Sequence, residues 1–327
     1  MEVLGNQIRV QSLAQDGKVV VPPRYVQPAE TRPKHDVEKR NDNDLPTPPV
    51  IDLSDSNSVH EELGRACREW GAFHIISHGV PHELLDEMRR VGRSFFEDCT
   101  MDQKLSYACD PNSPASEGYG SRMLAMSNDK VLDWRDYFDH HTLPLSRQNP
   151  SKWPHFSSDY RKVVAEYSDQ MNALAEKLLD AVGEFYQNIT VSYYPPCPQP
   201  ELTLGLQSHS DIGAISLLIQ DDLGGLEVWK DGEWIFVNPL HDAVFVILAD
   251  QIEVITNEQY KSAPHRAITN AKNARLCVAT FHDPGKTKVI RPAFEPPKYR
   301  PVVYGDHVLS WYSKGPEGKQ NVDALLL

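Results

Sequence analysis

The sequence has few cysteines, and their spacing gives no structural pattern. The odd count of five leaves no complete pairing, and no C-x-x-C motif occurs among Cys67, Cys99, Cys109, Cys197 and Cys277. This usage is typical of reduced thiols, and it disfavours both a disulfide framework and a structural zinc site.

Long apolar runs are also missing. The longest clean run, AVFVILA at 243–249, is much shorter than the roughly 18 residues that a membrane span needs. The N-terminal stretch MEVLGNQIRVQSLAQ mixes charged and amide side chains with apolar ones, so it lacks the hydrophobic region of a secretory signal. We therefore expect a cytoplasmic protein that does not associate with a membrane.

Positive charge is scarce in this chain. It has 33 lysines and arginines against 46 aspartates and glutamates, a net charge of −13, and no block rich in basic residues. A nucleic-acid backbone would be repelled on average. We therefore exclude nucleic acid as a partner and expect a small-molecule substrate, with a monomer as the default state.

The first half of the chain predicts an arm followed by helices and short strands. Residues 1–49 end in a polar, proline-punctuated stretch, which predicts an extended N-terminal arm. In residues 50–187, apolar residues at helical spacing predict three amphipathic helices. The first of these helices follows Ser58, which with Glu61 matches the sequence of a capping box. This region is expected to pack on the core.

The second half, residues 188–327, changes to short β-rich runs such as ISLLIQ, LEVWK, EWIFV and RLCVATF. Asp231 and Gly232 lie between two of these runs and predict a tight hairpin. Many short strands at such spacing are typical of a double-sheet jelly roll. The predicted fold class is mixed α/β, with an all-β core, a distorted double-stranded β-helix, flanked by the N-terminal helices.

Two polar residues interrupt the apolar stretch LQSHSDIGAIS. His209 and Asp211 occupy positions i and i+2, so in a strand their side chains emerge on the same face. His265, near the start of another strand-like stretch, is the best candidate for a third ligand. Two imidazoles and one carboxylate suit a non-haem Fe(II) oxygen site. With 13 histidines in the chain, these residues alone leave hydrogen-bonded histidines without a metal as an open alternative.

Arg275 opens RLCVATF, a strand whose other members are apolar. A buried arginine requires an anionic partner, and the strand contains no acid. A guanidinium in a barrel cavity could grip one carboxylate of a small diacid while the other end of the diacid chelates a metal. A structural ion pair with an acid elsewhere in the chain is the alternative.

The chain resembles a known family in a series of segments that stand in the family's order. These are PPVIDL, ACREWGAFHIISHGV, EGYGSR, LDWRDYF, SYYPPCPQPELTLGLQSHSD and PHRAITNAKNARLCVATFHDP. From about Val50 to Gly318 the sequence is similar to the plant-type 2-oxoglutarate/Fe(II)-dependent dioxygenases. The resemblance implies a jelly roll in which His209, Asp211 and His265 are the metal ligands and the catalytic centre. It also implies Fe(II), 2-oxoglutarate as cosubstrate and dioxygen, and it leaves a requirement for ascorbate open.

The resemblance further implies that Arg275 and Tyr194 bind 2-oxoglutarate. Beside them the chain departs from the family pattern, because Cys277 stands where the family usually has serine and Ser192 where it has asparagine. A thiol is a weak hydrogen-bond donor, which predicts weaker cosubstrate binding or a bridging water. The connection after Asp180 and the segment near residue 295 also look short, and the sequence leaves open whether they are true deletions.

The substrate pocket is predicted partly from the resemblance and comprises Phe281, Tyr119 and Phe138. Phe281 is an even number of residues from Arg275, so both face the same side of a strand. Aromatic walls suit a planar, largely apolar substrate, although each ring could simply fill the core. His140 and His141 are weaker candidates, with solvated loop histidines as the alternative. The C-terminal segment offers Lys314 as its one cation near the mouth, which disfavours an anionic substrate.

The sequence therefore predicts a plant oxidoreductase that hydroxylates, desaturates or demethylates a small, neutral aromatic or terpenoid-like specialised metabolite. Oxidation of a plant growth regulator is the runner-up. A metal-assisted hydrolase would give Arg275 no reason to face the cavity. A jelly-roll binding protein with weak turnover also remains open, because Cys277 and Ser192 depart from the family pattern.

Overall fold

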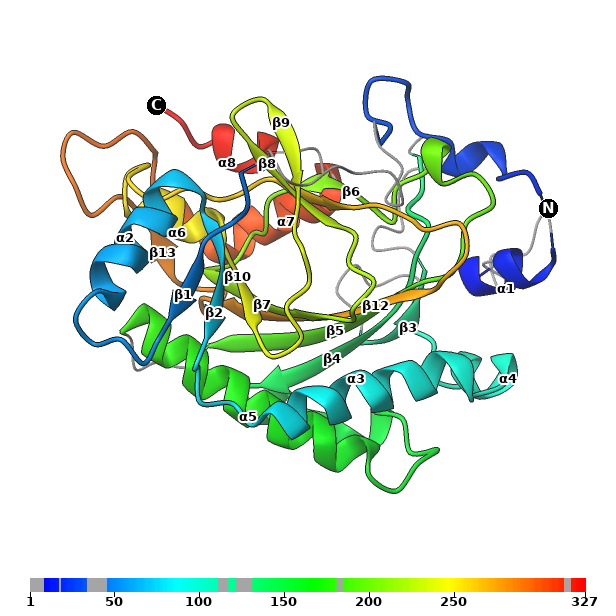
Figure 1. Cartoon of the computed structure of the whole chain (residues 1–327). Coiled ribbons are helices and arrows are strands. Elements are labelled where there is room, and N and C mark those ends of the chain that lie inside the picture. The colour runs from blue at the N-terminus through cyan, green and yellow to red at the C-terminus, as the bar shows by residue number, and fades with distance from the viewer. Residues whose placement is uncertain are drawn as a thin grey trace.

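The computed structural model describes residues 9–17, 19–33, 46–110, 117–121, 131–180, 185–314 and 319–327, with the side chains of 312–314 and 320 excepted. Two β-sheets face each other, and two long helices cover the outer face of the larger sheet (Figure 1). Among the described residues, no helix combines the length and the apolar character that crossing a membrane requires.

The larger sheet has eight strands in the order β1-β2-β10-β7-β12-β5-β4-β3. Neighbouring strands are antiparallel except β1 and β2. Their bounds are β1 Val50–Asp52, β2 Ala72–Ile76, β3 Gly118–Gly120, β4 Asp136–Leu143, β5 Tyr186–Tyr194, β7 Ile215–Gln220, β10 Val244–Leu248 and β12 Arg275–Asp283.

The smaller sheet has four strands in the order β6-β11-β8-β9. Asp231 and Gly232 form the two-residue turn between β8 and β9, with φ values of 48° and 92°. Two consecutive positive φ angles match the type I′ turn that suits the twist of a hairpin, and the predicted hairpin is confirmed. The bounds are β6 Leu206–His209, β8 Leu226–Lys230, β9 Glu233–Phe236 and β11 His265–Ala267, with a separate pair β13 Val289–Ile290 and β14 Val302–Val303.

The helices lie outside the two sheets. The three helices expected in the first half of the chain are present as α2, α3 and α5, and α3 and α5 pack beneath the larger sheet (Figure 1). The bounds are α1 Val10–Gln15, α2 Val59–Glu69, α3 His82–Glu97, α4 Met101–Leu105, α5 Tyr160–Leu179, α6 Asp250–Ile255, α7 Tyr304–Lys314 and α8 Gln320–Asp323.

Helix α2 begins where expected but without the expected capping box. Ser58 is the N-cap residue, yet its side chain caps no backbone N–H. Its hydroxyl instead donates to the carboxylate of Asp55 at 2.9 Å. The capping-box prediction was wrong because an acid three residues upstream competes for the serine side chain.

The N-terminal arm is not extended throughout. Its described part contains α1, whose first backbone N–H groups, those of Val10 and Gln11, donate to the buried carboxylate of Asp136 in β4, both at 2.9 Å. The carboxylate of Asp136 therefore accepts the hydrogen bonds that an N-cap side chain usually accepts, and it connects the arm to the larger sheet. Residues 34–45 of the arm and 181–184 after Asp180 lie outside the described residues. The division of the chain into three regions stays a prediction.

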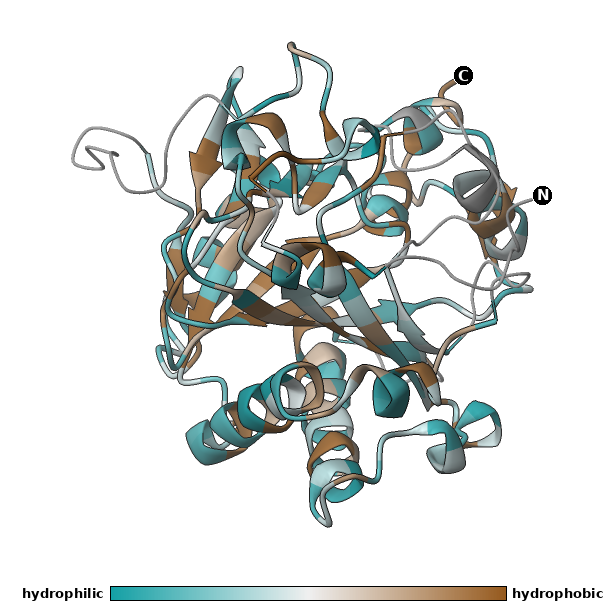
Figure 2. Cartoon of the chain, turned by 90° about the vertical axis from the view of Figure 1, so that its right-hand side faces the viewer, coloured by the Kyte–Doolittle hydropathy of each residue, from teal (hydrophilic) through white to brown (hydrophobic). Residues whose placement is uncertain are grey.

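Two apolar layers hold the structure together. One lies between the larger sheet and helices α3 and α5, and the other lies between the two sheets. In β12, Leu276 and Val278 join the first layer, whereas Cys277 and Ala279 join the second. Figure 2 shows hydrophobic residues running through the strands. The larger sheet is thus covered on both faces, and the predicted jelly-roll core with flanking helices is confirmed.

Candidate active site

A cavity of about 1040 Å³, including its open mouth, lies between the two sheets. Strands β4, β5, β7, β10 and β12 of the larger sheet and β6, β8 and β11 of the smaller sheet contribute to its walls. Trp311 of α7 also reaches the wall. The cavity contains every residue that the sequence predicted as a metal or cosubstrate ligand.

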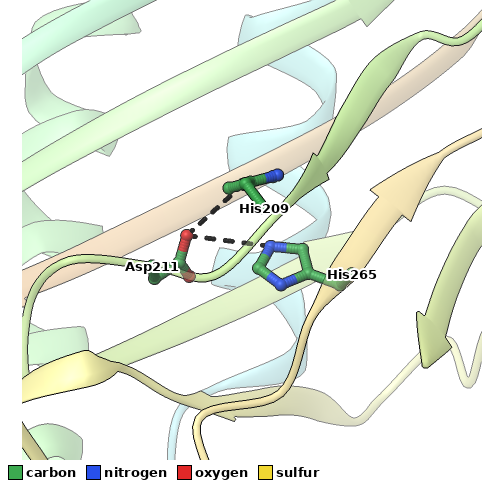
Figure 3. Close-up of side chains that lie close together, drawn as sticks. All are labelled: His209, Asp211 and His265. Carbon is green, nitrogen blue, oxygen red and sulfur yellow. Dashed lines mark ion pairs between the residues drawn. The ribbon is translucent and has the colours of Figure 1, made fainter. Parts of the chain in front are cut away.

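His209, Asp211 and His265 converge on one point of this cavity (Figure 3). His209 ends β6 and His265 opens β11, and these two residues are direct partners in the register of the smaller sheet. Asp211 follows in the loop after β6. Its Oδ1 lies 3.5 Å from Nε2 of His209 and 3.7 Å from Nε2 of His265. Two donor atoms that share one metal at roughly 2.1 Å can be at most about 4.2 Å apart, so both distances are compatible with a shared ion.

Both histidines are oriented by their second ring nitrogen. Nδ1 of His209 lies 2.8 Å from the carbonyl oxygen of Gln207, and Nδ1 of His265 lies 3.0 Å from that of Ala263. A carbonyl oxygen only accepts hydrogen bonds, so each Nδ1 must carry the proton. Nε2 of each ring therefore keeps its lone pair, and it is the ring nitrogen that lies within 3.7 Å of Oδ1 of Asp211, as a metal site requires.

The carboxylate of Asp211 is also prepared for a cation. Burial alone would raise its pKa, but the two neighbouring histidines and the hydroxyl of Ser216 lower it to about 2. Ser216 donates to Oδ2 at 2.5 Å, which leaves Oδ1 directed at the histidines. Burial lowers the pKa of His265 to about 4, so its ring is neutral at physiological pH. One carboxylate and two imidazoles form an iron-type donor set.

The loop that carries Asp211 is fixed from two sides. Backbone N–H groups at the start of α6 donate to the carbonyl oxygens of Asp211 at 2.8 Å and Gly213 at 3.0 Å. On its other side, a Cβ atom at Gly213 would lie 2.1 Å from Oδ1 of Asp283. Only glycine permits this approach, so the loop packs directly against the end of β12.

Arg275 lies at the opposite end of β12 and is 2% exposed. Its Nη2 donates to the side chain of Gln220 at 2.8 Å, while its Nε and Nη1 have no hydrogen-bond partner within the described structure. No carboxylate of the described residues lies within ion-pair distance of it, which argues against the structural ion pair considered above. Buried guanidinium donors without partners fit a site for a carboxylate ligand.

Tyr194, Cys277 and Ser192 surround this end of the cavity. Tyr194 is the register partner of Arg275, and its ring centroid lies 4.7 Å from the guanidinium carbon. Ser192 is the register partner of Cys277. The thiol of Cys277 lies 3.9 Å from the hydroxyl of Tyr194, a long and weak contact. All four residues line the cavity.

The other end of the cavity has an aromatic wall and two carboxyl groups. Phe281 lines it, as the parity of β12 predicted, and so do Trp311, Asp139 and Asp283. Burial raises the pKa of Asp139 and of Asp283 to about 7 each, although Thr190 donates to Asp139 at 2.8 Å. Lys314 was expected near the mouth, but its side chain lies outside the described residues.

Tyr119 and Phe138 do not line the cavity, and this part of the pocket prediction was wrong. Both are fully buried in the apolar layer against α3, where each packs edge to face with Phe95. In β4 it is Asp139 that faces the cavity, so its neighbour Phe138 points to the opposite face.

His140 and His141 divide between the same two faces. His140 is buried against the helices, where its ring nitrogens lie 2.9 Å from the carbonyl oxygen of Ile189 and 3.1 Å from the hydroxyl of Tyr160. His141 lies on the side of Asp139, with 3.7 Å between Nε2 and Oδ2. Neither histidine reaches the metal triad, and neither is the solvated loop residue of the alternative interpretation.

Sequence reasoning missed four charged residues of the cavity, Arg135, Asp139, Arg266 and Asp283, of which Arg266 forms an ion pair with Glu227 at 2.7 Å. The parity that found Phe281 applies equally to Asp283, eight residues from Arg275, so this residue could have been found. Arg135 stands in the segment LDWRDYF, which was quoted only for its resemblance. Asp139 could not be assigned, because both faces of β4 carry aromatic and polar side chains.

Comparison with known proteins agrees with this geometry. Residues 185–284 match the model of the 2OG-Fe(II) oxygenase superfamily, and residues 48–156 match that of the non-haem dioxygenase in morphine synthesis N-terminal region. The chain is 37% identical to jasmonate-induced oxygenase 1 of Arabidopsis thaliana, over 97% of this chain and 86% of that protein. It is 31% identical to leucoanthocyanidin dioxygenase of Malus domestica, over 92% of this chain and 93% of that one.

The fold comparison extends over nearly the whole chain. A crystal structure of JOX2 in complex with 2OG, Fe and JA superimposes with a TM-score of 0.89 at 35% identity, covering 98% of both chains. A metal triad and a buried arginine with free donors fit the cofactors of this group. The chain belongs to the 2-oxoglutarate- and Fe(II)-dependent oxygenase family and is a dioxygenase of the plant type.

Proposed function

We propose that His209, Asp211 and His265 hold Fe(II), and that Arg275 and Tyr194 bind 2-oxoglutarate. One observation carries this assignment: three oriented donors and a buried arginine with unpartnered N–H groups share a single cavity. When bound, Fe(II) with 2-oxoglutarate supplies the reactivity toward dioxygen. The reaction on the substrate is a hydroxylation, desaturation or demethylation, depending on which C–H bond lies nearest the metal.

The protein's own residues orient and shield the reactants. The carbonyl groups of Gln207 and Ala263 keep the Nδ1 protons of the two histidines in place, so the rings cannot turn away from the metal. Apolar side chains of both sheets, including Leu218 of the larger and Leu226 of the smaller sheet, line the same cavity and exclude water from it. Arg275 fixes the cosubstrate at one end, which leaves the opposite end for the substrate.

The substrate that this cavity fits best is a small, neutral aromatic or terpenoid-like specialised metabolite. Phe281 and Trp311 offer aromatic surface beyond the metal triad. Asp139 and Asp283 stand at the same end, and with pKa values of about 7 both are partly ionised at neutral pH. Their negative charge opposes a substrate carboxylate, which favours a neutral substrate.

Oxidation of a plant growth regulator is the second candidate. A specific observation favours it: the JOX2 structure, with a TM-score of 0.89, was solved in complex with JA. A regulator with a free carboxylate would place that group near the two acids of this cavity, whereas a neutral metabolite would not. The two candidates therefore differ most clearly for compounds that exist both as an acid and as a neutral ester.

Titration of the anaerobic protein with Fe(II) and 2-oxoglutarate tests the cofactor assignment. Wild type is expected to form the metal-to-ligand charge-transfer band, and Arg275→Gln to need about 100-fold more 2-oxoglutarate, because two or more charge-assisted hydrogen bonds are lost. Arg65→Gln, the same change on the exposed side of α2, is the control and should match wild type. Absence of the band in wild type would favour the binding protein with weak turnover.

Succinate release then tests the substrate class. Small aromatic and terpenoid compounds are offered in pairs, each acid beside its methyl ester, with succinate measured against a reaction without substrate. The esters and other neutral compounds are expected to be turned over with the higher kcat/KM. Faster turnover of the free acids would contradict the neutral-substrate proposal and support the growth-regulator alternative.

A further inference from the structure

A second arginine lies in the cavity, and nothing in the site described so far uses it. Arg135 precedes β4, is 4% exposed, and lines the same cavity as Arg275. No carboxylate of the described residues lies within ion-pair distance, and its Nε has no hydrogen-bond partner there. A guanidinium this deeply buried is costly unless an anion compensates its charge.

The surroundings of Arg135 hold its guanidinium toward the cosubstrate end of the cavity. Its Nη1 donates to the hydroxyl of Ser192 at 3.2 Å, and its guanidinium carbon lies 5.3 Å from the ring centroid of Tyr137. Burial raises the pKa of Tyr194, and the charges of both Arg275 and Arg135 oppose this rise. Both arginines therefore approach the same phenol.

Asp133 is the nearest acid in the sequence, but other groups occupy it. One of its carboxylate oxygens accepts hydrogen bonds from the backbone N–H of Gln207 at 3.0 Å and from the amide of Gln207 at 3.2 Å. These contacts direct Asp133 toward β6 and not toward Arg135. Its charge acts on Arg135 only at longer range.

The guanidinium of Arg135 meets β5 at Ser192, beside the level of Arg275 on the cavity wall. Arg275 stands opposite Tyr194, and Arg135 contacts Ser192, two residues further along β5. Two residues of a strand span roughly 6.6 Å. A ligand bound at Arg275 would therefore lie near a second guanidinium.

We propose that Arg135 is a second cosubstrate-binding arginine, which acts with Arg275 on 2-oxoglutarate. The assignment rests on the proposed function, since it presupposes that 2-oxoglutarate enters this cavity. Arg135 compensates for the weak donor at Cys277 and for the short side chain at Ser192, where the family usually has serine and asparagine. Its role is binding and positioning.

The test is the affinity of the anaerobic Fe(II) protein for 2-oxoglutarate, followed by the charge-transfer band. Arg135→Gln is expected to weaken 2-oxoglutarate binding about 10- to 100-fold, the loss of one or two hydrogen bonds to a charged group. Arg135→Lys keeps the charge but loses the planar fork, and a loss of about 3- to 10-fold is expected. Arg65→Gln is the matched surface control.

Metal binding without cosubstrate separates the outcomes. Fe(II) affinity, measured by competition with a chelator, is expected to stay within about twofold of wild type in both Arg135 variants, because Arg135 contacts no triad residue. Unchanged 2-oxoglutarate affinity in Arg135→Gln, or in Arg135→Lys should the first variant not fold, would overturn the proposal. Parallel loss of Fe(II) and 2-oxoglutarate binding would also overturn it, in favour of a structural role.

Two further outcomes are distinguishable. A variant whose 2-oxoglutarate affinity is normal while only the KM of an acidic substrate rises would reassign Arg135 to the substrate. A wild type that binds Fe(II) but shows no band with 2-oxoglutarate would instead overturn the proposed function itself, before any variant is compared.

Discussion

The two faces of β12 serve opposite purposes, although they alternate residue by residue. Leu276, Val278 and Thr280 point toward the helices, where each is fully buried. Arg275 and Cys277 point the other way, into the cavity, with Ala279, Phe281 and Asp283. One strand thus carries part of an apolar core on one face and part of the binding site on the other.

The difference shows how the fold separates stability from chemistry. The helix side holds a cluster of aromatic rings, in which Phe95 packs edge to face with Phe96, Tyr119 and Phe138. The cavity side instead holds charged groups, among them Arg275 and Arg135, each with at least one guanidinium N–H group that has no hydrogen-bond partner within the described structure. Changes on the helix side should therefore alter the free energy of unfolding, and changes on the cavity side should alter binding.

Two buried histidines give the largest expected contrast. His265→Gln removes a metal ligand on the cavity side, so Fe(II) affinity should fall more than about 100-fold, beyond the usual cost of losing an outer-shell partner. His140→Gln disturbs two hydrogen bonds on the helix side, so the free energy of unfolding should fall by about 1–3 kcal/mol with Fe(II) affinity intact. Chelator competition and urea denaturation measure the two quantities. A lower Fe(II) affinity in His140→Gln would show that the two faces are not independent.

Two phenylalanines, one on the helix side and one on the cavity side, allow the same comparison for side-chain packing. Phe95→Ala should lower the free energy of unfolding by about 3–5 kcal/mol, since a fully buried ring leaves a cavity. Phe281→Ala removes a partly buried ring from the cavity wall, so a smaller loss of stability and a higher substrate KM are expected. Denaturant titration and steady-state kinetics on the same preparations test both. A Phe281 variant that loses as much stability as the Phe95 variant would make that wall part of the core.

The carboxyl group of Asp139 should impose a pH dependence on stability. Burial raises its pKa from 3.8 to about 7, so the folded protein binds this proton more tightly than the unfolded chain does. Ionisation therefore destabilises the fold from about pH 4 upward, and the effect is complete above about pH 7. Asp139→Asn removes the charge, and it should stabilise the protein by on the order of 2–4 kcal/mol at pH 8 and by less at pH 5.

Asp169→Asn, on the exposed side of α5, is the control for Asp139→Asn. Urea titrations at pH 5 and pH 8 give the difference between variant and wild type at each pH. A difference that does not grow between these two values would show that the carboxyl group of Asp139 titrates normally in the folded protein.

The metal triad and β12 could be predicted from the sequence because a simple periodicity decides them. His209 and Asp211 share a face at i and i+2, and the parity that starts at Arg275 places Phe281 correctly. The hairpin at Asp231 and Gly232 could also be predicted, since two adjacent residues determine its turn type. In each case the deciding information lies within a few residues of the chain.

Strand β4 could not be read in this way. It has DYFDHHTL, with aromatic or polar residues on both faces, and no apolar side identifies the core. The sheet is covered on both sides, so Phe138 and Asp139 were equally plausible pocket residues before their neighbours were known. Tyr119 of β3 points to the same face as Phe138, because the two residues are register partners. Which face meets the cavity depends on contacts with β5 and α3, far away in the sequence.

Cys277→Ser should produce the smallest effect and sharpens the comparison within the cavity face. Cys277 is 4% exposed and lies 3.9 Å from the hydroxyl of Tyr194, too far for a strong hydrogen bond. A serine hydroxyl is a better donor to a carboxylate, so 2-oxoglutarate affinity should rise about two- to fivefold, with stability changed by less than about 1 kcal/mol. Anaerobic titration of the variant against wild type measures this gain. Unchanged affinity would mean that Arg275 and Arg135 already supply the hydrogen bonds that 2-oxoglutarate needs, and that the thiol of Cys277 does not weaken its binding.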